Sequence, residues 1–107
     1  MYYVNDGFYG IEPLSVYNVP DRFCDRQSFY GKAKIVECAD GIYLQSYDTL
    51  VCFKSHCGTF TKMWSGYSHT TQRHINAFMY HYCGIRCGGK AWWNALEVNK
   101  EYRLEDL

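Results

Sequence analysis

The chain has 107 residues, the size of one ordinary domain with a modest core. Hydrophobic residues make up 48% of it and aromatic residues 19%, which excludes a disordered tail. Eleven basic and eleven acidic residues give a net charge of zero, which argues against a bulk phosphate-binding surface and equally against an acidic mimic of DNA.

The N-terminal part, residues 1–27, is predicted to be an extended arm. It contains both prolines and two glycines, and it has no sustained hydrophobic period. Its first residues show neither the charged region nor the apolar region of a signal peptide, and no apolar run in the chain approaches the roughly 20 residues of a membrane span. We therefore expect a protein that stays in the cytosol and has no membrane partner.

Residues 28–66 are predicted to form an antiparallel sheet. Four β-rich runs follow one another closely, and the short segments ADG (39–41) and SHCG (55–58) read as turns. Such a succession is typical of a four-stranded meander. The runs are GKAKIVEC (31–38), IYLQSY (42–47), TLVCFK (49–54) and TFTKMW (59–64).

Residues 67–98 are predicted to be helical. Ser68 is a favourable N-cap for a main helix, and Gly84 is a plausible stop. A short second helix is expected in GGKAWWNALEV (88–98), and residues 99–107 form a charged tail. The apolar stripe of the main helix consists of Ile75, Phe78, Met79 and Tyr82. The expected fold class is α+β: a single domain, 1–107, with one main helix packed across a four-stranded antiparallel meander.

Six cysteines in a chain without an export signal favour metal binding or buried thiols over disulfides. A helix of about 15 residues spans roughly 22 Å, so its last turn should return to the end of the sheet that holds the SHCG turn. Two short-spaced cysteine pairs would then converge on a structural, tetrahedral Zn²⁺. The ligands we expect are Cys52, Cys57, Cys83 and Cys87, with His56 and His81 as substitutes.

The alternative without a metal is that Cys52 is a core strand residue and Cys83 fills the helix face, because cysteine is often buried. Cys24 and Cys38 are expected to be plain buried thiols. If the zinc interpretation holds, the chain is a small zinc-stabilised domain.

No catalytic constellation is visible in the sequence. Cys57 paired with His74 or His81 would be a nucleophile and a base, but no surrounding residue indicates a lowered thiol pKa. GIRCGGK (84–90) resembles a phosphate loop only loosely, since it follows a helix and not a strand. We therefore expect no catalytic residues, no enzymatic activity and no small-molecule substrate.

Two surface features bear on partners. Five basic residues could share a face, although a solvated sheet edge explains them equally well. Eleven tyrosines fit a protein-binding surface better than catalysis, because Tyr is common at binding hot spots, although it is also a good strand residue. The basic residues are Lys32, Lys34, Lys54, Lys62 and Arg73.

Four segments carry a family resemblance over about residues 26–98. They are SFYGKAKIVE (28–37), YLQSYDTLV (43–51), WSGYSHTTQRHINAF (64–78) and GKAWWNALEV (89–98). The chain resembles a family of small uncharacterised proteins of bacteriophages, prophages and other mobile elements. The most specific pattern is YSxTTxRHxNxF, carried here by Tyr67, Ser68, Thr70, Thr71, Arg73, His74, Asn76 and Phe78. Most members of the family that the chain resembles lack the full cysteine set, so a metal site would be a feature of this branch.

This resemblance implies a phage-encoded protein in the bacterial host cytoplasm that inhibits a host defence. The leading hypothesis is an anti-CRISPR inhibitor of a type II effector nuclease that binds the protein directly and blocks DNA loading or a domain movement. The zero net charge argues against direct nucleic-acid binding. The alternatives are a phage nucleic-acid-binding accessory protein that uses the basic strand face, and a structural or regulatory phage domain.

Overall fold

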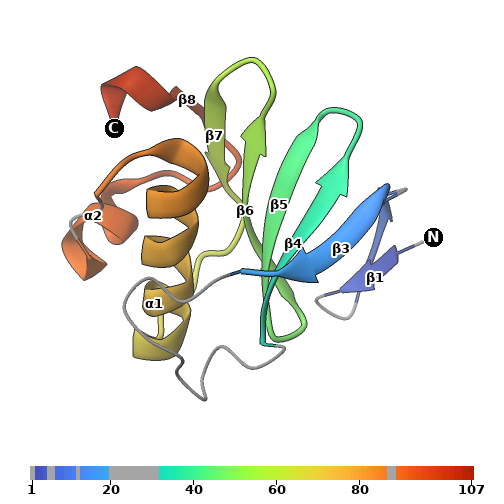
Figure 1. Cartoon of the computed structure of the whole chain (residues 1–107). Helices are drawn as coiled ribbons and strands as arrows, with labels where there is room; N and C mark the ends of the chain where they lie inside the picture. The colour runs from blue at the N-terminus through green and yellow to red at the C-terminus, as the bar shows by residue number, and fades with distance from the viewer. Residues whose placement is uncertain (1, 5–6, 12, 20–31, 87–88) are drawn as a thin grey trace.

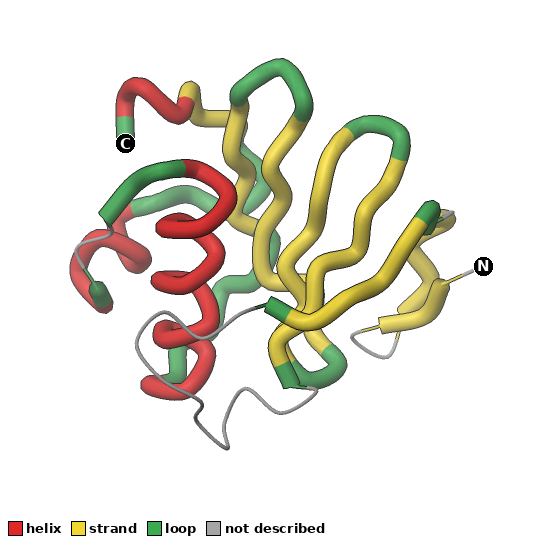
Figure 2. Tube along the Cα trace, in the orientation of Figure 1, coloured by secondary structure: helices red, strands yellow, loops and turns green. Residues whose placement is uncertain are grey.

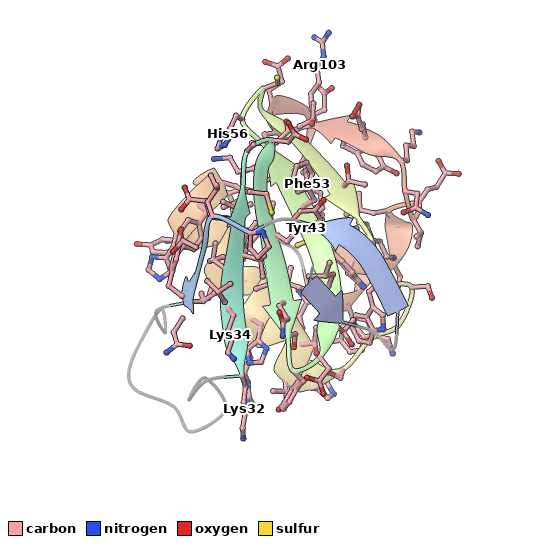
Figure 3. The ribbon with its side chains drawn as sticks, turned by 90° about the vertical axis from the view of Figure 1, so that its right-hand side faces the viewer. Lys32, Lys34, Tyr43, Phe53, His56 and Arg103 are labelled. Carbon is pink, nitrogen blue, oxygen red and sulfur yellow. The ribbon has the colours of Figure 1, made fainter. Side chains whose placement is uncertain are left out.

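The computed structural model describes residues 2–4, 7–11, 13–19, 32–86 and 89–107. Within these ranges the chain forms a six-stranded antiparallel sheet in the order β3-β4-β5-β6-β7-β8, with the helices on one side of it (Figures 1 and 2). The strands are β3 (Ser15–Asn18), β4 (Ala33–Cys38), β5 (Gly41–Ser46), β6 (Thr49–Ser55), β7 (Thr59–Lys62) and β8 (Glu101–Arg103). A separate hairpin of β1 (Tyr2–Val4) and β2 (Gly7–Ile11) lies on the side of the sheet away from the helices (Figures 1 and 3).

The predicted four-stranded meander is wrong, because the sheet has six strands. Strands β4 to β7 lie where the sequence predicts them, and one further strand is added at each edge. β3 comes from the predicted N-terminal arm and pairs with β4, and β8 comes from the predicted tail and pairs with β7. Both are only three or four residues long, too short for a recognisable alternation. They form because β4 and β7 offer backbone groups that need partners.

The zinc-stabilised domain is also wrong as a description of this fold. Among the residues that the structure describes, no group of three or more His, Cys, Asp or Glu side chains could hold a metal ion. The layers are held together by an apolar core between the sheet and the helices. Its fully buried members include Ile35, Leu44, Cys52, Phe60, Ile75, Phe78 and Trp93. Burial of this apolar surface is the main stabilising term.

The main helix begins and ends as predicted. α1 (His69–Phe78) begins after Ser68, whose hydroxyl accepts a hydrogen bond from the N–H of Thr71 at 3.0 Å. It continues as a π-helical turn, η2 (Met79–Cys83), which ends at Gly84 with φ +68°. The left-handed conformation of Gly84 stops the helix.

Two short helical segments complete the chain. α2 (Lys90–Ala95) is the predicted second helix, and η3 (Leu104–Asp106) is a 3₁₀ turn after β8. No helix in the described ranges is long and apolar enough to cross a membrane.

Candidate functional site

The four cysteines chosen as zinc ligands do not share one environment. Cys52 lies in β6 and is fully buried in the core. Cys57 lies in the turn between β6 and β7, where it is exposed and lines a surface hollow with Arg103 of β8. Cys83 is partly buried at the end of η2. Cys87 lies outside the described residues.

Of these cysteines, only two that the structure describes lie at least partly in the interior, Cys52 and Cys83. Burial raises the pKa of Cys83 to about 11, only partly offset by the nearby Lys54. His56 and His81, the substitute ligands, are both exposed. Zinc binding by a set that includes Cys87 stays a prediction, which elemental analysis of the purified protein together with a free-thiol count would check.

A buried polar cluster joins α1 to the end of β5. The hydroxyl of Ser46 lies 2.8 Å from Nδ1 of His74 and 3.1 Å from Oγ1 of Thr71, and all three side chains are buried. The Ser46–His74 contact has the length of a nucleophile–base pair. Because Ser46 is only 2% exposed and shares its hydroxyl with Thr71, we interpret the cluster as a structural link between helix and sheet.

A cavity of about 200 Å³ opens beside this cluster, between the β5–β6 turn and the start of α1. Among the residues that the structure describes, its lining has four serine and threonine residues, two aromatic residues and no charged residue. The buried lining residues are Ser46, Val51 and Thr71, and the more exposed ones are Tyr47, Thr49, Trp64 and Ser68. These described residues can therefore offer hydrogen bonds and stacking surfaces, but no charge.

The outer edge of β3 has no partner strand in the described part of the chain. Among the described strands β3 pairs only with β4. The N–H of Val19 donates to the carbonyl of Ala33 at 2.9 Å, and the register places Tyr17 opposite Ile35. Since hydrogen-bonding directions alternate along an antiparallel strand, the backbone groups of Val16 and Asn18 point away from β4. This edge can accept another strand.

The side chains at this edge are apolar and exposed. Leu14 is 72% exposed, Val16 43% and Tyr17 39%, and β3 contains no charged residue. At the opposite edge of the sheet, β8 contains Glu101 and Arg103. Charged side chains are a common protection of sheet edges against pairing with another chain. The β3 edge lacks that protection.

A family model, described as a family of unknown function (DUF8033), matches residues 17–95. The chain belongs to this family. The matched region contains the polar cluster and the cavity, and it leaves out β8 and the first two residues of β3. The family resemblance predicted over residues 26–98 is thus confirmed in part: the chain is a member of a family, and that family has no assigned function. No curated protein and no solved structure matches the chain.

The lysines of this DUF8033 domain do not form one basic face. Lys62 is buried, and its ammonium donates to two main-chain carbonyls near the end of α2, at 2.8 and 3.1 Å. The ammonium of Lys54 donates to the carbonyl of Tyr82 at 2.7 Å. Lys32 and Lys34 lie together at one end of the sheet (Figure 3). Two of the four lysines that could have made a basic strand face therefore direct their charge inward.

Neither the cavity nor the β3 edge was predicted from the sequence. Thr71 and His74 lie in the YSxTTxRHxNxF pattern, and Ser46 and Tyr47 lie in the segment YLQSYDTLV. The family resemblance therefore marked these residues, but it gave them no role. For β3 the only signal was the short segment SVYN (15–18), which is too short to stand out.

Proposed function

We propose that the protein inhibits a bacterial host defence by binding directly to one of its proteins, and that it is not an enzyme. The observation that carries the proposal is the unprotected, apolar outer edge of β3. The resemblance to proteins of bacteriophages and mobile elements directs the choice of target, which we take to be the guide-loaded effector nuclease of a type II CRISPR system. In this proposal the protein is phage-encoded and acts in the host cytoplasm.

The proposed mode of binding is strand addition. An extended segment of the effector pairs with the outward backbone groups of Val16 and Asn18, and main-chain hydrogen bonds supply part of the affinity. The exposed Leu14, Val16 and Tyr17 side chains contribute apolar contacts and selectivity. The bound domain then obstructs DNA loading or a domain movement of the nuclease. A chain with zero net charge is poorly suited to mimic DNA.

The nucleic-acid-binding alternative has less support from the described side chains. It requires a continuous basic strand face, whereas Lys54 and Lys62 donate to main-chain carbonyls within the protein. Nucleic-acid binding would also weaken steeply with salt, because each neutralised phosphate releases a counterion. Strand addition depends on main-chain hydrogen bonds and apolar contacts. We expect binding to the effector to change less than tenfold between 50 and about 200 mM salt, against a loss of about a thousandfold or more for multiple phosphate contacts.

The test is a cleavage assay with purified effector and guide RNA, combined with a direct binding measurement. Wild-type protein is expected to bind the guide-loaded effector and to suppress cleavage near stoichiometric concentration. Val16→Pro removes an outward N–H without removing a β3–β4 hydrogen bond, so it should weaken inhibition at least tenfold while the protein stays folded. Val16→Lys should do the same, because lysine protects sheet edges.

Val98→Lys is the matched control, because Val98 is 37% exposed and lies outside β3. It should inhibit like the wild type. Equal inhibition by Val16→Pro and wild type would refute strand addition at β3. A protein that neither binds the effector nor slows its cleavage at large molar excess would refute the proposed target.

A further inference from the structure

The cavity between the β5–β6 turn and α1 has the lining of a small-ligand site. Its volume of about 200 Å³ is enough for a single ring system and too small for a drug-sized molecule. Tyr47 and Trp64 supply aromatic surfaces, and Thr49 and Ser68 bring hydroxyls to its more exposed part. None of the described lining residues carries a charge, so these residues favour an uncharged inserted group.

Tyr47 has a backbone conformation that a tyrosine rarely adopts. Its φ is +55°, in the left-handed region that suits Gly or Asn. Its N–H donates to the carbonyl of Lys32 at 2.7 Å, and its ring centroid lies 5.9 Å from that of the buried His74. The side chain is nevertheless 48% exposed, so its own burial does not account for a bulky residue at this position. A bulky residue at a strained position next to a cavity points to a role for its ring.

We propose that this cavity binds a single nucleobase, supplied by a free nucleoside or nucleotide or by an unpaired position of a single strand. A base has flat faces, which stack on tyrosine and tryptophan rings, and it concentrates its hydrogen-bonding groups along its edges. Tyr47 and Trp64 provide the stacking surfaces, and Thr49 provides a hydroxyl for an edge of the base. The Ser68 hydroxyl accepts the N–H of Thr71 and can still donate its proton to the base.

Two other ligand classes fit the lining less well. A pyranose brings several hydroxyl groups, each of which needs a partner when buried. Three of the four serine and threonine hydroxyls are already engaged, so few hydrogen-bonding groups remain for a sugar. Those of Ser46 and Thr71 bond to each other, and that of Ser68 accepts the N–H of Thr71. An inorganic anion would find no charged partner among the described lining residues.

The described charges near Tyr47 are of both signs. The ammonium of Lys32 lies 5.9 Å from the centroid of the Tyr47 ring, and Asp48 follows Tyr47 in the β5–β6 turn. We therefore assign the recognition to the base and not to a phosphate.

The test is titration calorimetry of the full chain. The ligands are the four common nucleosides, their 5′-monophosphates, an unstructured ten-nucleotide single strand, glucose and inorganic phosphate. We expect at least one nucleoside to bind with one site per chain, and glucose and phosphate to bind at least tenfold more weakly. A ten-nucleotide strand that binds much more tightly than the mononucleotide would identify an unpaired base of a strand as the occupant. Equal affinities would identify the free nucleotide.

Tyr47→Asn is the decisive variant. It removes the ring and places a residue that tolerates positive φ at position 47, so the fold should be retained. Base binding should weaken at least tenfold. Tyr80→Asn is the matched control, because Tyr80 is 45% exposed and lies on η2, away from the cavity lining, so affinity should stay within twofold of wild type.

Three results would overturn the proposal. They are no binding of any base at millimolar concentration, equal binding of glucose or phosphate, and unchanged affinity in Tyr47→Asn. The proposal goes beyond the inhibition proposed above and uses a different surface. Val16→Pro should therefore leave base binding unchanged, and Tyr47→Asn should leave inhibition unchanged, so the two proposals can fail independently.

Discussion

Replacing Lys62 with methionine tests how a buried ammonium contributes to this fold. Lys62 is only 4% exposed, and its Nζ donates to the carbonyls of Trp93 and Leu96 at 2.8 and 3.1 Å. The same atom lies 4.7 Å from the centroid of the Trp93 ring. Methionine keeps most of the apolar stem and removes the charge, so Lys62→Met isolates the link between β7 and the end of α2.

The expected change follows from opposing contributions. Each hydrogen bond from a charged donor is worth about 1.5–3 kcal/mol, and a desolvated cation–π contact adds about 1–2 kcal/mol. Against this, taking an ammonium out of water costs several kcal/mol, and that burial lowers the pKa of Lys62. The carbonyl of Trp93 keeps a second donor, the N–H of Leu96 at 3.2 Å. We therefore expect a net destabilisation of about 2 kcal/mol, which corresponds to a fall in Tm of roughly 10 °C for a domain of this size.

Urea unfolding followed by tryptophan fluorescence measures the free energy, and a thermal melt checks the shift in Tm. Lys100→Met is the control. Its ammonium forms a surface ion pair with Glu97 at 3.2 Å and lies 5.2 Å from the Tyr102 ring, so it should cost less than about 1 kcal/mol. If Lys62→Met were as stable as the wild type or more stable, desolvation would outweigh the hydrogen bonds and the reasoning would be refuted.

Three further outcomes are expected. Ser46→Ala should destabilise the fold by about 1–3 kcal/mol in urea unfolding, because buried His74 loses a hydrogen-bond partner; a change below about 0.5 kcal/mol would contradict the polar link. Gly41→Ala should lower the free energy of unfolding by about 3 kcal/mol or more, because the added Cβ would clash with the main-chain oxygen of Lys54. A melting curve like that of the wild type would exclude such a clash. Wild-type stability should fall between pH 9 and about 11, because the unfolded chain releases the thiol proton of Cys83 before the folded chain does. Cys83→Ala should make that fall shallower without abolishing it, because burial also raises the pKa values of Tyr43 and Tyr82. An unchanged slope would show that Cys83 does not contribute.

The central strands and the main helix were predictable because their signals are local. β4 to β7 are joined by short turns, and their alternating side chains stand out in the sequence. For α1, the Ser68 cap and the Gly84 stop act on backbone groups within a few residues of themselves. Neighbouring residues are enough to specify such features, so their predicted positions are confirmed to within a few residues.

The edge strands were not predictable in the same way. Three residues of β8 and four of β3 hold no periodic pattern of their own. They pair because the sheet presents unpaired edges at β7 and β4, and those edges exist only after the central strands have assembled. The number of strands therefore depends on the assembled sheet and could not be predicted from local sequence patterns.

The sequence by itself determined an α+β domain in which β4 to β7 are followed by a capped helix, and it marked the segments that contain Ser46, Tyr47, Thr71 and His74. Only the tertiary structure decided that Cys52 belongs to the core, that Lys62 directs its charge inward, and that the β3 edge and the cavity exist. The physical reason is sequence distance. Ser46 and His74 are 28 residues apart and Lys62 and Trp93 are 31 apart, so their contacts depend on how the layers pack, which no local pattern encodes.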